Sequence, residues 1–158
     1  RFQQDFINWE SGNEVVDKFI QDVQLRARNP NDIIEWIPFE NLKNIKYLAK
    51  GGFGVVSTAK WPEGYMVCWD HENQIWDRCS NKYVCLKSLN DSANISSEFL
   101  KEVQVQLKFR RKGSAIPIYG ITQDPKTNDF MIVMDYAENE SLRRFLDKFF
   151  NKLSWADK

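Results

Sequence analysis

Apolar residues recur at helical spacing near the start of the chain. Within residues 14–27, one stripe of a helix would carry Val16, Phe19, Ile20, Val23 and Ala27. Asn29-Pro30 ends this pattern, because a proline cannot continue a helix. A second apolar cluster follows at residues 33–37. Residues 1–41 are therefore predicted to form a helical extension that packs its apolar face on the rest of the protein.

From residue 46 onward, apolar and polar positions alternate as they do in strands. The pattern predicts a strand, a glycine-rich turn and a strand over residues 46–60, then a long hairpin over 61–82 that turns near Asn73. Further strands are predicted at residues 84–89, 115–121 and 130–136, with a turn at 122–129. Helices are predicted at residues 96–109 and 138–150. This order predicts an α+β fold, in which one helix crosses a five-stranded, mostly antiparallel sheet.

Composition and charge narrow the classes of protein that fit. Hydrophobic residues make up 42% of the 158 residues, which is enough for a packed core. Lys+Arg and Asp+Glu both total 22, so no net charge draws the chain to nucleic acid or to an acidic membrane. No apolar run reaches the roughly 18 residues of a membrane-spanning helix. We therefore expect a cytoplasmic protein with neither of these partners.

The cysteines suggest a reducing environment and no metal site. They are three in number, so they cannot all pair within the chain, and free thiols are expected. Cys68, His71 and Cys79 lie close together in sequence, but their spacing fits no common zinc pattern. No metal ligands are predicted.

Three features that are weak alone occur in a specific order. Gly51-Gly52-Phe53-Gly54 falls between two predicted strands, where glycines let backbone N–H groups approach phosphate oxygens, although hairpin turns are also glycine-rich for conformational reasons. Lys87 lies within an apolar strand, where an ammonium group needs an anionic partner unless it faces solvent. Glu102 lies in the predicted helix at 96–109. Glu98 is one turn away, so spacing alone does not choose between these two carboxylates.

This order of glycine loop, strand lysine and helix glutamate resembles the protein kinases. The resemblance covers roughly residues 42–158. The segment 48–56 is similar to the kinase Gly-rich loop, 84–87 to the lysine strand, 99–103 to the regulatory helix, and 131–137 to the fifth strand and hinge. The residues within these motifs are most similar to those of the tyrosine-kinase-like branch. The sequence resembles in particular the large kinase family of arbuscular mycorrhizal fungi, as do the tryptophan-rich extension and hairpin.

The resemblance implies a kinase N-lobe that binds ATP. It divides the chain into an extension at 1–41, an N-lobe at 42–137 with a hairpin insert at about 62–82, and the hinge exit with the start of the C-lobe at 138–158. It makes Lys87 and Glu102 the ion pair that positions ATP, and it selects Glu102 over Glu98. The residues that it places around the nucleotide are Leu48, Gly51, Gly52, Phe53, Gly54, Val56, Lys87, Met134 as gatekeeper, Asp135 and Ala137.

Two departures from the kinase pattern affect the functional prediction. Ala49 replaces the first glycine of the loop. This should be tolerated, because the resemblance makes Gly51 and Gly54 the glycines that face the phosphates. The His-Arg-Asp motif does not occur, since His71 in the hairpin is the single histidine. The Asp-Phe-Gly motif does not occur either: Asp129-Phe130 begins like one but is followed by Met131 on the predicted fifth strand. The expectation is therefore an N-lobe that is inactive as given, with phosphorylation of protein Ser/Thr or Tyr, and Mg²⁺, belonging to the complete domain. The alternative is a non-catalytic, pseudokinase-like interaction module. The protein substrate and the Ser/Thr or Tyr preference are not indicated.

Overall fold

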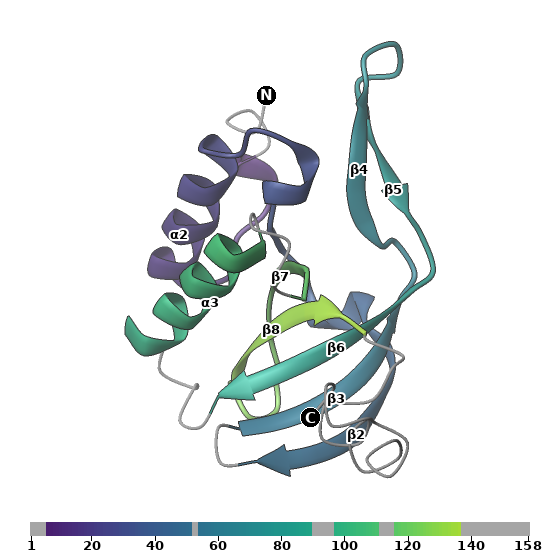
Figure 1. The fold of residues 1–158 in the computed structure, drawn as a ribbon. Coiled ribbons are helices and arrows are strands. Elements are labelled where there is room, and N and C mark those ends of the chain that lie inside the picture. Colours follow the sequence, from purple (N-terminus) through teal and green to yellow (C-terminus); the bar gives the residue numbers. More distant parts are fainter. Residues whose placement is uncertain (1–5, 52–53, 90–96, 111–115, 137–158) are drawn as a thin grey trace, which may run out of the picture.

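The computed structural model describes residues 6–51, 54–89, 97–110 and 116–136. Its helices are α2 (Glu14–Leu25) and α3 (Ser97–Arg110), with short 3-10 helices at Phe6–Asn8, Pro30–Asp32 and Phe39–Asn41. Its strands are β1 (Glu35–Trp36), β2 (Lys43–Gly51), β3 (Gly54–Trp61), β4 (Tyr65–Asp70), β5 (Ile75–Cys79), β6 (Lys82–Leu89), β7 (Ile118–Gln123) and β8 (Phe130–Asp135). Figure 1 shows a twisted sheet with two helices on one side and a long hairpin rising beyond it.

Within the described residues, the main sheet has six strands in the order β1-β7-β8-β6-β3-β2. The prediction of five strands was therefore wrong by one. The additional strand is β1, which comes from the extension and pairs parallel with β7 through Glu35 opposite Gly120 and Trp36 opposite Ile121. The other neighbouring pairs are antiparallel, as predicted.

Strand β7 also extends further than the sequence pattern indicated. Thr122 and Gln123 were predicted to begin a turn, but they continue the strand because they pair with Met131 and Phe130 of β8. The turn that follows lies at residues 125–127. Here cross-strand pairing outweighs the polar character of the two side chains.

Helix α2 begins at a clear capping residue. The Asn13 side-chain oxygen accepts hydrogen bonds from the backbone N–H groups of Val15 and Val16, at 3.0 and 3.2 Å. Asp17 in the first turn accepts a bond from the N–H of Ser11 at 2.9 Å, which fixes the chain ahead of the helix. These bonds satisfy donors that the first turn of a helix leaves free. The helix ends at Leu25, two residues before the predicted end at 27.

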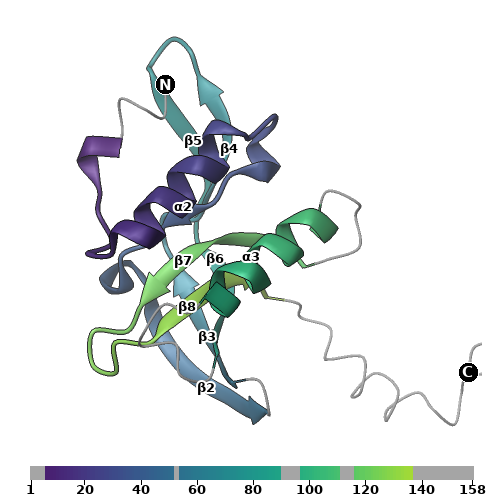
Figure 2. The ribbon, with the colours of Figure 1, turned by 90° about the vertical axis from the view of Figure 1, so that its left-hand side faces the viewer.

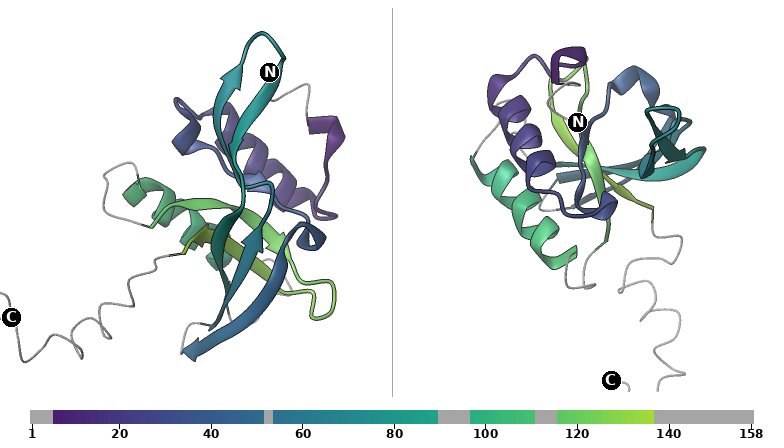
Figure 3. Two further views of the ribbon diagram at one scale, coloured as in Figure 1. Left: turned by 90° about the vertical axis from the view of Figure 1, so that its right-hand side faces the viewer. Right: turned by 90° about the horizontal axis from the view of Figure 1, so that it is seen from above.

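The two faces of the sheet bury different sets of side chains. Both helices lie against one face, as the two turned views show (Figures 2 and 3). The core on this side consists of Val16, Phe19, Ile20, Ile34, Phe99, Val103, Ile118, Ile121, Phe130, Ile132 and Met134. The core on the other side consists of Ile37, Leu42, Ala59, Trp61, Val84, Leu86, Tyr119, Met131 and Val133. The extension therefore contributes apolar side chains to both cores.

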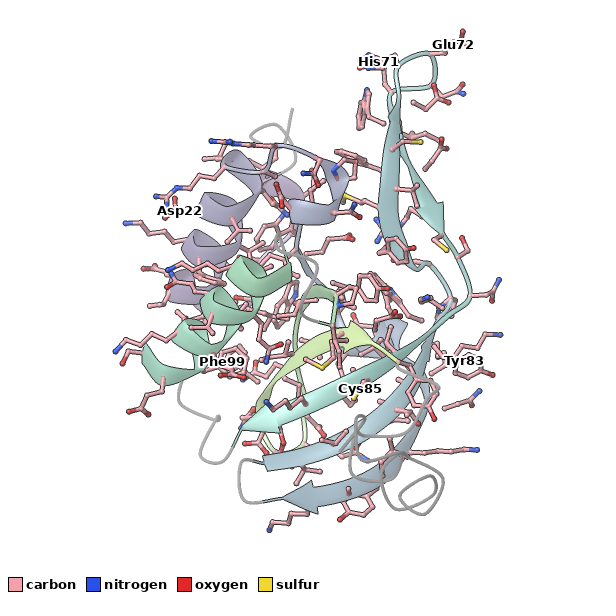
Figure 4. The ribbon with its side chains drawn as sticks, in the orientation of Figure 1. Asp22, His71, Glu72, Tyr83, Cys85 and Phe99 are labelled. Carbon is pink, nitrogen blue, oxygen red and sulfur yellow. The ribbon has the colours of Figure 1, made fainter. Side chains whose placement is uncertain are left out.

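Strands β4 and β5 form a separate two-stranded ribbon at the predicted hairpin. Asp70 closes its turn by accepting bonds from the N–H groups of Glu72 and Asn73, at 2.8 and 3.1 Å. The rings of Trp69 and Trp76 meet edge to face, with centroids 5.3 Å apart, just below the turn. Figure 4 places the labelled Glu72 at the tip, far from the main sheet.

Neither a membrane span nor a metal site is found in the part of the chain that the structure describes. None of its described helices combines the length and the apolar character that crossing a bilayer requires. No three His, Cys, Asp or Glu side chains among the described residues gather closely enough to hold a metal ion. The helix predicted at residues 138–150 lies outside the described residues.

Candidate functional site

Lys87 and Glu102 meet where strand β6 faces helix α3. The Lys87 Nζ atom lies 3.3 Å from Glu102 Oε1, and the two side chains are 24% and 36% exposed. Lys87 projects from the face that the helices cover, because its strand neighbours Leu86 and Val84 point into the opposite core. Glu98, the other candidate carboxylate, is exposed to solvent. The structure therefore brings Lys87 together with Glu102.

A glutamine on the same helix supports this carboxylate. The Gln106 amide nitrogen donates to Glu102 Oε1 at 2.6 Å, from one turn further along α3. This hydrogen bond, together with the positive charge of Lys87, lowers the pKa of Glu102 below its ordinary value, against a smaller opposing effect of burial. The carboxylate is thus held in its charged form, ready to pair with an ammonium group. The sequence-based prediction did not include Gln106, although its i+4 spacing from Glu102 is the signal that would have indicated it.

The strand register places two rows of side chains on the face that carries Lys87. In one row, Val56 of β3 lies opposite Lys87, which lies opposite Ile132 of β8. The next row runs from Thr58 through Cys85 to Met134. Directly opposed residues share a face of the sheet. Val56 and Met134, both predicted to lie around the nucleotide, therefore lie on the same surface as Lys87.

Cys85 is a member of this surface that the sequence-based prediction missed. It lies two residues before Lys87, and strand alternation would have been enough to place it on the same face. Figure 4 shows it on β6. Burial raises the pKa of the Cys85 thiol above its ordinary value, while Lys87 opposes that shift. The thiol is therefore kept neutral and presents a small apolar surface beside Met134.

The glycine-rich turn joins β2 and β3 at the end of the sheet nearest the Lys87–Glu102 ion pair. Gly51 and Gly54 are opposite each other at the base of the turn, and Gly54 has a φ angle of 141° that favours glycine. The Ser88 hydroxyl of β6 accepts a bond from the N–H of Val55 at 3.3 Å, which ties the start of β3 to the lysine strand. Gly52 and Phe53 lie outside the described residues.

Leu48 of β2 has no directly opposite residue in the β2–β3 register. The register shifts between Tyr47 and Ala49, so the β2 strand has a bulge at Leu48, whose side chain is half exposed. Ala49, which departs from the glycine pattern, pairs with Val56 in the regular ladder. A methyl group is therefore accommodated at position 49.

The end of β8 provides the remaining predicted contacts. The Asp135 backbone N–H donates to the Pro117 carbonyl at 2.8 Å, which ties the end of β8 to the residue just before β7. Lys82 Nζ lies 3.2 Å from Asp135 Oδ1 and anchors this residue to the start of β6. A cavity of about 470 Å³ lined in part by Thr58 and Tyr136 opens beside it. Ala137, also predicted to lie around the nucleotide, lies outside the described residues.

Two comparisons with known proteins bear on this arrangement. The family model for protein tyrosine and serine/threonine kinases matches residues 34–158. A curated relative, the tyrosine-protein kinase SPK-1 of Girardia tigrina, is 24% identical over 107 residues, which cover 68% of this chain. The aligned region is 18% of that relative, so the chain spans less than a fifth of its length.

Proposed function

Because the chain belongs to the protein tyrosine and serine/threonine kinase family, we propose that it forms the ATP-binding N-lobe of a kinase domain in signal transduction. The domain division proposed is the one that the resemblance implies, with residues 42–137 as the lobe and 138–158 as the hinge exit and the start of the C-lobe. Within the family we place it in the tyrosine-kinase-like branch, near the large kinase family of arbuscular mycorrhizal fungi. The complete domain would phosphorylate Ser, Thr or Tyr of a protein substrate.

The observation that carries this proposal is the Lys87–Glu102 ion pair on the surface shared with Val56 and Met134. Glu102 orients the ammonium group, which would then hold the α- and β-phosphates of ATP. α3 would thus be the regulatory helix, because its position sets the place of Glu102. A charged pair at the edge of an apolar surface matches a ligand with a charged phosphate chain and an apolar ring.

The other contacts follow from the same orientation. The backbone N–H groups of the 51–54 turn would approach the phosphates, with Phe53 covering them. Val56 and Leu48 would pack on the adenine ring opposite Met134. The carbonyl of Asp135 and the backbone of Ala137 would hydrogen-bond its edge. ATP supplies the phosphoryl group when bound, and Mg²⁺ is expected only with the complete domain, because its ligand motifs are not found in the 158 residues.

Nucleotide binding by the purified chain tests the proposal. Titration with a fluorescent ATP analogue should give saturable binding that unlabelled ATP competes away. Lys87→Met and Glu102→Gln should each weaken it, by about tenfold or more for the lysine, because a phosphate-binding charge is lost. Lys101→Met and Glu98→Gln are matched controls, since both side chains are exposed on α3, the helix that carries Glu102.

The outcome separates the two functional readings. Binding that the Lys87 and Glu102 substitutions weaken, while the control substitutions leave it unchanged, supports the kinase N-lobe. A folded chain that binds no nucleotide favours the non-catalytic interaction module. Time-dependent phosphate transfer by this chain alone would contradict the proposed dependence on the complete domain.

A further inference from the structure

Helix α2 of the extension and helix α3 share one core. Phe19 and Ile20 of α2 are buried in the same cluster as Phe99 and Val103 of α3. The helices lie side by side over one face of the sheet in Figure 1 and in the right-hand view of Figure 3. Figure 4 shows Phe99 on the side of α3 that faces the sheet. The extension therefore forms part of the surface on which α3 rests.

Helix α3 has few buried side chains of its own. Of the α3 side chains that the structure describes, Phe99 and Val103 are fully buried, and Leu100 and Leu107 are partly so. Glu102 is adjacent to Val103 in sequence, so a rotation of the helix about its axis would swing the carboxylate away from Lys87. Among the described side chains, the ion pair thus depends on how firmly these four apolar residues hold the helix.

Helix α2, in contrast, is anchored to the sheet independently of α3. The Gln24 amide nitrogen donates to the Ile34 carbonyl at 2.8 Å in a buried hydrogen bond. Beyond Ile34, β1 pairs with β7, and the Ile37 N–H donates to the Ile121 carbonyl at 2.9 Å. Because α2 is held to the sheet by its own hydrogen bonds, it can support α3 beside it.

We infer that residues 14–37 brace α3 and thereby hold Glu102 at Lys87, with Phe19 and Ile20 as positioning residues for nucleotide binding. The inference rests on the proposed function, since its effect is expressed through the ATP-positioning pair. A cavity of about 300 Å³ is lined by side chains of both helices, among them Val23 of α2 and Leu107 of α3.

A double-mutant cycle distinguishes bracing from general stabilisation. Phe19→Leu should weaken binding of the fluorescent ATP analogue by about three- to tenfold in the unchanged chain. In the Glu102→Gln background the same substitution should change the affinity by less than about twofold, because the group through which it acts is already lost. Val15→Ala is the control, since Val15 is 58% exposed on the same helix. Ile20→Val replaces Phe19→Leu if that variant does not fold.

Hydrogen exchange supplies a measurement that needs no nucleotide. Phe19→Leu should speed exchange of α3 amides more than that of β6 and β8 amides, whereas Val15→Ala should change neither. Equal loss of affinity in both backgrounds, no loss at all, or a uniform rise in exchange would overturn the brace. If the unchanged chain binds no nucleotide, the proposed function fails. The exchange pattern in α3 then still decides whether the extension braces the helix.

Discussion

Arg78 of the hairpin forms an ion pair with Glu35 of the extension, with Nη2 lying 2.7 Å from Glu35 Oε2. The same guanidinium donates to the Gly64 carbonyl, at 2.9 Å from Nε, and lies 5.5 Å from the centre of the Trp61 ring. One side chain thus joins the base of the hairpin to strand β1. Since β1 also pairs with β7, the Arg78–Glu35 ion pair connects the hairpin, through the extension, to the edge of the main sheet.

Removing the Arg78 charge should destabilise the fold strongly. Arg78→Met keeps most of the aliphatic stem but leaves the Glu35 carboxylate, which is 14% exposed, without its cation. Losing one partner of a largely buried pair costs about 3 kcal/mol of unfolding free energy. Urea unfolding measures this loss, and Lys126→Met, in an exposed turn, is the control. Adding Glu35→Gln to Arg78→Met should restore part of the stability. A double variant with a lower unfolding free energy than Arg78→Met alone would contradict this account.

The sequence predicted most elements because their patterns are local. The stripe from Val16 to Val23 and the alternation around Lys87 each depend on residues a few positions apart. Strand β1 was missed because two residues, Glu35 and Trp36, carry no measurable period. Their pairing with Gly120 and Ile121 depends on a segment some 85 positions away.

The candidate site, too, could be predicted from the sequence only in part. The kinase resemblance pointed to Lys87, Val56 and Met134 as residues around the nucleotide. Spacing could not choose between Glu98 and Glu102, because they lie one turn apart on the same side of the helix and the choice depends on where α3 lies along its axis relative to Lys87. That position is set by how the helix packs on the sheet, and no local pattern encodes it.

The stability contribution of Glu35 should fall as the pH rises. Burial raises the pKa of Glu35 above its ordinary value of 4.5, and Arg78 offsets only part of that shift. The folded protein therefore binds this proton more tightly than the unfolded chain does, so the contribution is complete below about 4.5 and is lost as pH rises through the folded pKa. Urea midpoints of the unchanged chain and of Glu35→Gln, compared across this range, measure it. A difference between the two chains that grows in favour of the unchanged chain with rising pH would contradict the prediction.

Glu102 should show the opposite dependence. Its pKa is lowered, first by the Gln106 hydrogen bond and then by Lys87, so its contribution is present above the unfolded pKa and is lost as pH falls through the folded one. Gln106→Leu should raise the pKa of Glu102, because the carboxylate loses a donor to its charged form. Carbon-13 NMR of the Glu102 carboxyl during a pH titration measures the shift. Gln104→Leu, on an exposed position of the same helix, should leave it in place.

Gly120 should be intolerant of any side chain. A Cβ atom at this position would lie 2.1 Å from the Glu35 carbonyl oxygen and 2.9 Å from Ile37 Cδ1, so β1 could not stay paired with β7. Gly120→Ala should lower the unfolding free energy by about 2–4 kcal/mol, as overpacking against backbone does. It should also speed hydrogen exchange of the Ile37 amide, which is bonded to Ile121. Lys126→Ala, in an exposed turn, should do neither. If Gly120→Ala left both the stability and this amide unchanged, close packing of β1 on β7 would be ruled out as the anchor of the extension.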